Sequence, residues 1–196
     1  MLHKDRKAAL RRERLASRDA MSVESRIEAS LAIADAGAAA IEVLPGTIVS
    51  GFFPIRSEVD IRPLLAKLRE RGARLALPII HDRETIVFRE LLPGAELVDT
   101  GFGTRGPGPE APVVDPGLML VPLAAFDARG HRIGYGAGYY DRAIARLRAS
   151  GKEPRLIGIA FDCQEVPEVP AEDHDVELEA LLTESGFRVF GKQVSA

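Results

Sequence analysis

The stretch LMLVPLAAFDARGHRIGYGAGYYDRAIARLRASGKEPRLIGIAF, residues 118–161, determines the fold class. Its two ends, 118–122 and 155–161, are short apolar runs of the kind that form buried strands. Between them a glycine-rich turn leads into a helix expected over 139–148 and closed by Gly151. A strand, a helix and a strand in this order form a right-handed crossover between parallel strands. The stretch therefore predicts an α/β protein.

The flanking sequence continues the alternation of helices and strands. Helices are expected over 3–17, over 22–42 with Ser22 as N-cap, and from Asp60 as N-cap to Arg71, with Gly72 following. Further strands are expected over 47–53, 74–78, 84–91, 180–183 and 187–190. Residues 94–116 are rich in Gly and Pro and predict a long loop. The apolar periodicity of the second helix predicts a buried face of Ile27, Leu31, Ala34, Ala38 and Ile41.

Composition limits the class of protein. The chain has 196 residues, of which 46% are hydrophobic and 28% charged, so a disordered chain is excluded. No shift in composition marks a linker, and we expect one three-layer α/β/α domain over 1–196 with a mainly parallel, Rossmann-like sheet. Cys163 is the only cysteine, which is typical of a reducing compartment. No apolar run has the length of a membrane span or signal peptide, so a cytoplasmic protein is expected.

The charge is distributed unevenly. Residues 1–18 carry seven basic and two acidic side chains, a net +5, which leaves −8 for the rest of the chain. Lys7, Arg11, Arg14 and Arg18 would form one stripe along the first helix. The stripe could be an ordinary solvated helix face, or it could bind an anion, either nucleic acid or a small phosphorylated ligand.

Two glycine clusters invite a nucleotide interpretation. Residues 101–106 match G-x-G-x-x-G, but Pro107 follows where a helix would have to open, so a dinucleotide site is rejected there. The second cluster, 132–142, lies between a strand and a helix, where open α/β sheets bind ligands. Its alternating glycines expose N–H groups to an anion, Arg132 adds charge, and Asp141 could hold Mg²⁺. A tight turn with packed tyrosines and a capping Asp explains the same residues, and no P-loop pattern is present.

With these motifs in place, the sequence resembles the 5-formyltetrahydrofolate cyclo-ligase family, also called methenyltetrahydrofolate synthetase. The resemblance covers almost the whole chain, and its most specific element is G-x-G-x-G-Y-Y-D-R at 134–142. The other matching elements occur in a fixed order: K-x-x-L-R at 7–11, S-E-V-D at 57–60, Pro122, Phe126-Asp127, I-G-I-A-F at 157–161, Gln164, His174-Asp175 and Thr183.

The resemblance implies an ATP- and Mg²⁺-dependent conversion of 5-formyltetrahydrofolate to 5,10-methenyltetrahydrofolate, with release of ADP and phosphate. It implies catalytic roles for Arg132 and Tyr140 and magnesium ligation by Asp141 and Asp175. The implied ATP contacts are Lys7, Arg11, Arg132, Gly134, Tyr135, Gly136, Ala137, Gly138, Tyr139 and Tyr140. The implied folate contacts are Phe53, Glu58, Gly136, Gly138, Tyr139 and Tyr140.

Other functions remain as alternatives at this stage. A non-catalytic folate- or nucleotide-binding protein could share the fold. A nucleic-acid-binding module is disfavoured by the acidic remainder of the chain and by the aromatic content of 6% without Trp. We expect a monomer that acts on 5-formyltetrahydrofolate and ATP and binds neither nucleic acid nor membrane. His174 could take part in acid–base chemistry or orient a neighbour, and it is left out of the catalytic set.

Overall fold

A large mixed sheet forms the centre of the computed structural model, which describes residues 3–101, 103–172 and 175–191. Its strand order is β12-β11-β10-β7-β1-β2-β3-β6. The five inner strands, β11, β10, β7, β1 and β2, run parallel, and the outer pairings are antiparallel. The bounds of the sheet strands are β1 Ile48–Ser50, β2 Arg74–Ile80, β3 Ile86–Glu90, β6 Val113–Val114, β7 Leu118–Pro122, β10 Arg155–Ile159, β11 Ala180–Thr183 and β12 Gly186–Val189.

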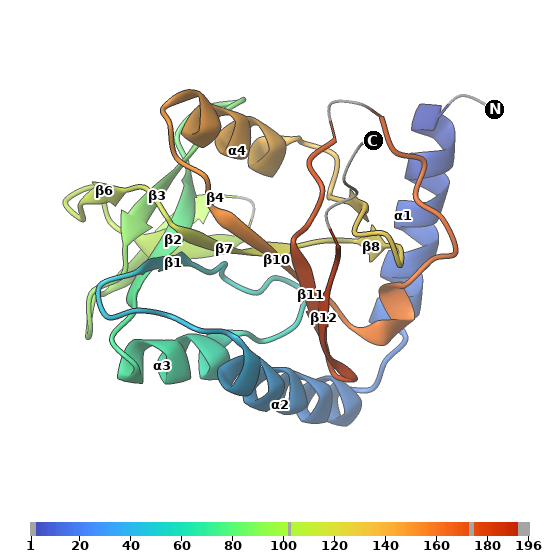
Figure 1. Cartoon of the computed structure of the whole chain (residues 1–196), viewed down its shortest axis with the longest axis horizontal. Coiled ribbons are helices and arrows are strands. Elements are labelled where there is room, and N and C mark those ends of the chain that lie inside the picture. Colours follow the sequence, from blue (N-terminus) through green and yellow to red (C-terminus); the bar gives the residue numbers. More distant parts are fainter. Residues whose placement is uncertain (1–2, 102, 173–174, 192–196) are drawn as a thin grey trace.

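Helices cover both faces of this sheet. Helices α2 (Val23–Ala40) and α3 (Arg62–Glu70) lie on one face, and α4 (Tyr139–Ala149) lies on the other (Figure 1). Each face has its own apolar core: Ile33, Leu64 and Leu68 pack on one side, and Ile144 and Leu147 on the other. The expected three-layer α/β/α arrangement is therefore confirmed. Helix α1 (His3–Asp19) belongs to neither layer and stands at one end of the molecule, beside β8 (Figure 1).

The predicted crossover is present and creates a switch point in the sheet. Strands β7 and β10 pair in parallel from Leu118 opposite Arg155 to Pro122 opposite Ile159, with α4 connecting them. Strand β1 connects to β2 through α3 on the opposite face. The connections that leave the neighbouring strands β1 and β7 therefore run on opposite faces of the sheet and toward opposite edges of it. Such a switch point opens a crevice at the carboxyl ends of the strands.

The prediction that 94–116 is a plain loop was wrong. Strands β4 (Leu97–Gly101) and β5 (Thr104–Pro107) pair there as a hairpin, and β6 joins the main sheet. The Gly and Pro content concealed these strands. Gly106 is in this strand because it packs closely: an added Cβ would clash with the Ile79 side chain. The described residues of the rejected motif, 101 and 103–106, lie in β4, in β5 or between them and open no helix, as predicted.

The buried face predicted for α2 was half wrong. Ala34, Ala38 and Ile41 are buried as expected, whereas Ile27 and Leu31 are 56% and 51% exposed. The helix instead presents small residues to its neighbours: a Cβ on Gly37 would meet side chains of Leu182 and Leu64 within 3 Å. Leucine side chains of β11 and α3 pack directly against the helix backbone at this face, which a pattern of large apolar residues does not reveal.

The helix ends agree with the predicted signals in three of four cases, including Gly151, which follows the end of α4 with a φ of +78°. Ser22 caps α2 by accepting the Ser25 N–H at 3.0 Å, and Gly72 follows α3 with a φ of +93°. Asp60 was wrong as the N-cap of α3, because Ile61 holds that position; the Asp60 carboxylate accepts the Arg62 N–H from one residue further out. No helix in the described part of the chain has the length and apolar character needed to cross a bilayer.

Candidate active site

A largely apolar cavity of about 170 Å³ lies at the carboxyl ends of β1, β2 and β7, at the switch point of the sheet. Strand ends, the loop after β1 and the glycine-rich segment before α4 form its walls. The lining residues are Phe52, Phe53, Ile55, Glu58, Pro78, Ile80, Ile86, Thr104, Pro122, Arg132, Gly134, Tyr135, Ala137, Gly138, Tyr139, Tyr140 and Asp141. A flat heterocycle with a few polar edges suits such a cavity.

Two polar groups stand out in this apolar lining. The Glu58 carboxylate accepts the Ile55 N–H at 2.9 Å. Burial raises the pKa of Glu58, although hydrogen bonding from Tyr135 and Ile55 and the charges of Arg18 and Arg56 oppose the shift. The Tyr140 hydroxyl is buried and has no hydrogen-bond partner among the described residues. An unsatisfied hydroxyl in a ligand-sized cavity is a donor available to a ligand.

The glycine-rich segment connects β9 (Arg132–Ile133) to α4. Gly136 and Gly138 have φ values of +100° and +68°, which other residues rarely adopt. At Gly136 an added Cβ would lie 3.4 Å from the Arg11 guanidinium. A Cβ at this distance would make only ordinary van der Waals contact, so the positive φ values, and not the approach of α1, require glycine here. It ends at the N-terminus of α4, where exposed N–H groups and the helix dipole favour an anion.

Helix α1 reaches the rest of the protein through its basic stripe. Arg11 Nε donates to the Gly134 carbonyl at 2.7 Å, and Arg14 donates to the Cys163 carbonyl at 3.1 Å. Arg18 is the one residue of α1 that is fully buried. The predicted stripe is therefore not a solvated face, and its side chains point toward the glycine-rich segment and its surroundings.

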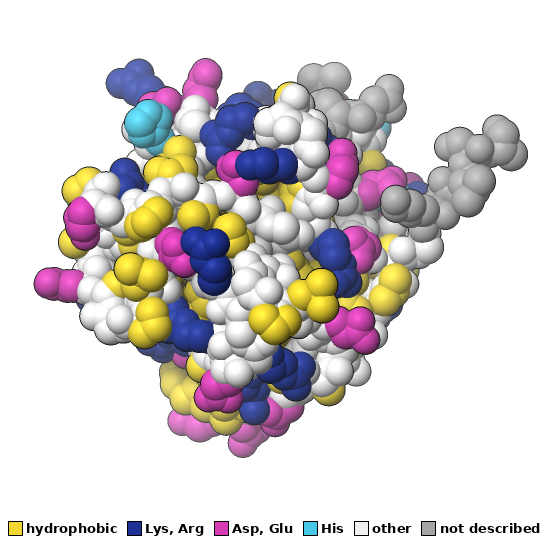
Figure 2. All heavy atoms as spheres, turned by 60° about the vertical axis from the view of Figure 1, so that its left-hand side comes forward, with side chains coloured by type: hydrophobic (Ala, Val, Ile, Leu, Met, Phe, Trp, Pro, Cys, Tyr) yellow, Lys and Arg dark blue, Asp and Glu magenta, His cyan; other side chains and the backbone are white. Residues whose placement is uncertain are grey.

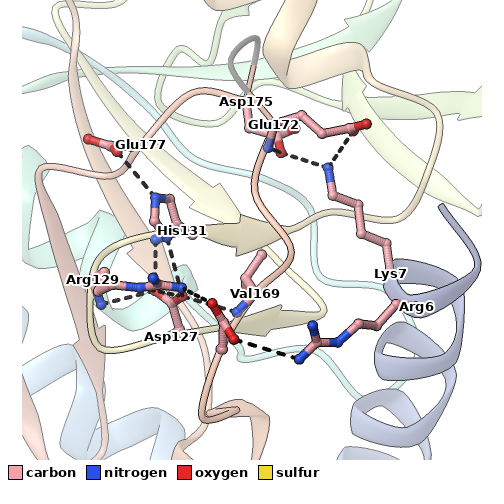
Figure 3. A network of polar contacts seen from close by, with 10 residues as sticks. Arg6, Lys7, Asp127, Arg129, His131, Val169, Glu172, Asp175 and Glu177 are labelled. Atoms are coloured by element: carbon pink, nitrogen blue, oxygen red, sulfur yellow. Dashed lines mark hydrogen bonds and ion pairs between the residues drawn. The ribbon is translucent and has the colours of Figure 1, made fainter. Parts of the chain in front are cut away.

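Lys7 bridges α1 to the segment before β11. Its Nζ lies 2.6 Å from Asp175 and 2.9 Å from Glu172, and Figure 3 shows the side chain extending from the helix toward both carboxylates. Burial acts against the charge, but the hydrogen bonds to Asp175 and Glu172 outweigh it and raise the pKa of Lys7. Lys7 is therefore a fixed positive charge at neutral pH.

Arg132 connects the two predicted magnesium residues. Its guanidinium donates to Asp141 at 2.6 Å and to the carbonyl of Val176, the residue after Asp175. Asp141 lines the apolar cavity, and Asp175 lines a polar groove of about 730 Å³. The two carboxylates thus belong to neighbouring depressions, with the buried Arg132 reaching toward both.

Comparison with known proteins identifies the family. The sequence profile of the 5-formyltetrahydrofolate cyclo-ligase family matches residues 3–184, nearly the whole chain. The chain belongs to this family. The predicted enzyme class is thereby confirmed.

Cyclo-ligase relatives are similar in sequence and in fold. The 5-formyltetrahydrofolate cyclo-ligase of Escherichia coli (strain K12) is 33% identical over 143 residues, 70% of this chain and 78% of the relative. The solved 5,10-methenyltetrahydrofolate synthetase of Aquifex aeolicus superposes with a TM-score of 0.80 at 28% identity, covering 97% of this chain and 95% of its own. The Mycoplasma pneumoniae synthetase shares the fold, with a TM-score of 0.73 at 23% identity over 91% and 98% of the two chains.

The predicted site residues of this cyclo-ligase divide into two groups in space. The residues around the apolar cavity are Phe53, Glu58, Arg132, Gly134, Tyr135, Ala137, Gly138, Tyr139, Tyr140 and Asp141. Lys7, Arg11, Gly136 and Asp175 lie outside its lining. His174 lies outside the described residues.

Several cavity residues escaped the sequence analysis. Phe52, Ile55, Pro78, Ile80 and Thr104 line the cavity and carry no local signal, because they are ordinary strand-end or hairpin residues. The basic stripe in the sequence already included Arg18. That its side chain points toward the cavity wall depends on how α1 packs against the rest of the protein.

A buried carboxylate organises the turn that precedes the glycine-rich segment of the cyclo-ligase. Asp127 sits between β8 (Ala125–Phe126) and β9, with a side chain 0% exposed. It accepts hydrogen bonds from the Val169 N–H at 3.0 Å, the Arg129 guanidinium at 2.9 Å and the His131 ring at 3.2 Å (Figure 3). The turn and the segment that presents Glu172 and Asp175 to Lys7 are therefore fixed to one carboxylate.

Asp127→Asn is expected to lower the free energy of unfolding by about 1.5–3 kcal/mol, because it removes charge-assisted hydrogen bonds to a fully buried carboxylate whose partner Arg129 is 47% exposed. Burial alone would raise the pKa of Asp127, but the Val169 N–H and Arg129 outweigh it and lower the pKa. The stabilisation is thus present above the unfolded-state pKa and is lost as the pH falls through the folded-state value. Urea unfolding at neutral and acidic pH measures both effects.

Asp115→Asn is the matched control for this substitution. Asp115 pairs with Lys152, but its side chain is 40% exposed, so we expect a loss of about 1 kcal/mol or less. Equal losses in the two variants at neutral pH would contradict the role given to Asp127.

Proposed function

We propose that the chain catalyses the ATP- and Mg²⁺-dependent conversion of 5-formyltetrahydrofolate to 5,10-methenyltetrahydrofolate, releasing ADP and phosphate. One observation carries the proposal: an apolar cavity with a buried carboxylate and an unpartnered hydroxyl directly adjoins a glycine-rich segment contacted by α1. The cavity suits a pterin, and the adjoining cations and N–H groups suit the phosphates of a nucleotide. Membership of the cyclo-ligase family supports both assignments.

On the folate side, the chain's own residues bind and orient the pterin. Phe53 and Tyr139 provide apolar surface in the cavity lining. The Glu58 carboxylate accepts hydrogen bonds from pterin N–H groups, and the free Tyr140 hydroxyl donates toward the substrate. These contacts would hold the formyl group facing the glycine-rich segment, which forms the wall of the same cavity.

On the nucleotide side, positive charge and backbone N–H groups hold the phosphates. Lys7 and Arg11 approach from α1, and the 134–138 backbone leads into the N-terminus of α4. Arg132 is buried beside Asp141 and adds charge near the cavity. Phosphoryl transfer depends chiefly on positioning and charge stabilisation, and these residue types supply both.

The reaction needs an activated formyl oxygen. The formyl oxygen attacks the γ-phosphorus, the bond to the bridging oxygen breaks, and ADP leaves with that electron pair. N10 of the folate then attacks the formyl carbon of the resulting imidate phosphate. Loss of the N10 proton and departure of phosphate, which carries the former formyl oxygen, complete the methenyl bridge.

The donor set is compatible with magnesium. Asp141 and Asp175 offer carboxylate oxygens, the ligand type that Mg²⁺ prefers; Asp141 pairs with Arg132, and Asp175 precedes Val176, whose carbonyl accepts from the same guanidinium. The described ranges contain no group of three or more His, Cys, Asp or Glu side chains that could hold a metal by itself. A site of this kind fits a metal whose remaining ligands are nucleotide phosphates and water. When bound, Mg²⁺ would neutralise phosphate charge.

The distribution of charged side chains on one face of the molecule is consistent with an enzyme that acts on small molecules. On the face in Figure 2, Lys and Arg side chains are interspersed with acidic and apolar ones, unlike the continuous basic surface typical of nucleic-acid-binding proteins. We therefore propose that the chain acts as a single domain and as a monomer, in the cytoplasm, on folate and ATP.

The deciding assay mixes the protein with Mg²⁺, ATP and 5-formyltetrahydrofolate and follows the absorbance of the methenyl product together with ADP. We expect one ADP for each methenyl bridge formed. Well-folded protein that binds both ligands without forming product would instead be the non-catalytic binding protein considered above.

A further inference from the structure

Arg18 is a buried cation that connects α1 to the cavity wall. Its side chain is almost completely enclosed, with the residue 2% exposed. Arg18 Nε donates to Ser57 Oγ at 3.0 Å, and its guanidinium donates to the Tyr135 hydroxyl at 2.6 Å. Both direct partners are neutral hydroxyls. A buried charge with neutral partners is costly unless a nearby opposite charge balances it.

Two carboxylates lie near enough to balance it: Asp19, which accepts a hydrogen bond from the same Ser57 hydroxyl, and Glu58 in the cavity wall. Glu58 follows Ser57 in sequence, and the Tyr135 hydroxyl that receives the Arg18 hydrogen bond also acts on Glu58 by hydrogen bonding. The Arg18 guanidinium additionally lies 5.8 Å from the centre of the Tyr135 ring. Tyr135 as a whole is 40% exposed, while its hydroxyl contacts the buried cation. Arg18 therefore contacts neighbours of Glu58 on both sides.

We propose that Arg18 is a positioning residue for the folate substrate: it fixes Ser57 and Tyr135 on the two sides of Glu58 and supplies the positive charge that balances the Glu58 carboxylate. The inference rests on the proposed role of Glu58 in folate binding. It also makes α1 a shared element, with Lys7 and Arg11 directed toward ATP and Arg18 toward the folate cavity.

Removal of the Arg18 charge is expected to shift the pKa of Glu58 in one direction, and this shift can be measured. Loss of the Arg18 charge raises the pKa of Glu58 further, so protonation of Glu58 reaches higher pH and the acid limb of folate binding moves upward. The other titratable and charged groups around Glu58 are the same in both Arg18 variants: Arg56 and Asp60 in its own loop, Tyr135, Tyr140 and Arg132 in the cavity wall, Asp19 on α1, and Arg26 on α2.

The test compares Arg18→Gln, which removes the charge, with Arg18→Lys, which keeps it. Arg18→Gln is expected to raise KM for 5-formyltetrahydrofolate about tenfold or more, leave KM for ATP within about twofold, and shift the acid limb of kcat/KM for folate to higher pH. Arg18→Lys is expected to raise KM while the acid limb stays in place. Arg14→Gln, one turn earlier and bonded to Cys163, is the control expected to change neither.

Equal changes in KM for folate and KM for ATP, with no shift in the acid limb of kcat/KM, would overturn the proposal. Arg18 would then only support the fold. If Arg18→Gln does not fold, Tyr135→Phe decides, because it removes the hydroxyl between Arg18 and Glu58; an unchanged KM for folate would then contradict the proposal. The affinity for 5-formyltetrahydrofolate can also be measured directly at several pH values, without turnover. This measurement tests the role of Arg18 even if the proposed reaction does not occur.

Discussion

Lys7→Ala is expected to lower kcat/KM for ATP by about 10²–10³-fold while the fold remains intact. Lys7 is a fixed charge on the face of α1 that reaches the segment beside Arg132, and a preorganised cation at a transferring phosphoryl group has effects of this size. Its ion pairs with Glu172 and Asp175 lie near the surface, so their loss is expected to lower the free energy of unfolding by only about 1 kcal/mol. Steady-state kinetics with varied ATP, together with thermal unfolding, measure both quantities.

Lys4→Ala is the matched control, since Lys4 is an exposed lysine three residues earlier on the same helix. We expect its kinetics to equal those of the unsubstituted protein. An unchanged KM and kcat in Lys7→Ala would remove Lys7 from the ATP site.

Glu58→Gln is expected to lower kcat/KM for 5-formyltetrahydrofolate by about 10²-fold or more, with ATP binding unchanged, because charge-assisted hydrogen bonds to the pterin are lost. Stability should move in the opposite direction. Since burial raises the folded-state pKa of Glu58 above the unfolded value, the ionised carboxylate destabilises the fold at pH above both values. The variant is therefore expected to have an equal or higher melting temperature at neutral pH.

Glu70→Gln, at the exposed end of α3, controls for loss of an acidic side chain without loss of a cavity carboxylate. A clear drop in the melting temperature of Glu58→Gln, with folate kinetics unaltered, would show that Glu58 supports the fold and does not bind the substrate.

The sequence was most informative where local chemistry dictates structure. The crossover over 118–161, the cap at Ser22 and the turn glycine at Gly72 were all predicted, because each depends on nearby residues. The glycine-rich segment was located for the same reason. Positive φ values at Gly136 and Gly138 explain why glycine is required there.

Features that depend on tertiary packing could not be predicted. The buried face of α2 follows from close contact at Gly37, and the β4–β5 hairpin follows from the approach of Gly106 to Ile79. The pairing of Arg132 with Asp141 and of Lys7 with Asp175 needs the folded arrangement of separate segments. Candidate residues for each role could be named from local patterns, whereas their division between an apolar cavity and a neighbouring polar groove depends on the folded structure.

The central claim is that the formyl oxygen is phosphorylated in a cavity adjoining the nucleotide site, and an isotope measurement tests it most directly. 5-Formyltetrahydrofolate labelled with ¹⁸O in the formyl group is converted with Mg²⁺ and ATP, and the released phosphate is analysed by mass spectrometry beside an enzyme-free control for exchange with water. The account predicts one ¹⁸O atom in each phosphate released. Unlabelled phosphate, with the label recovered in water, would contradict it.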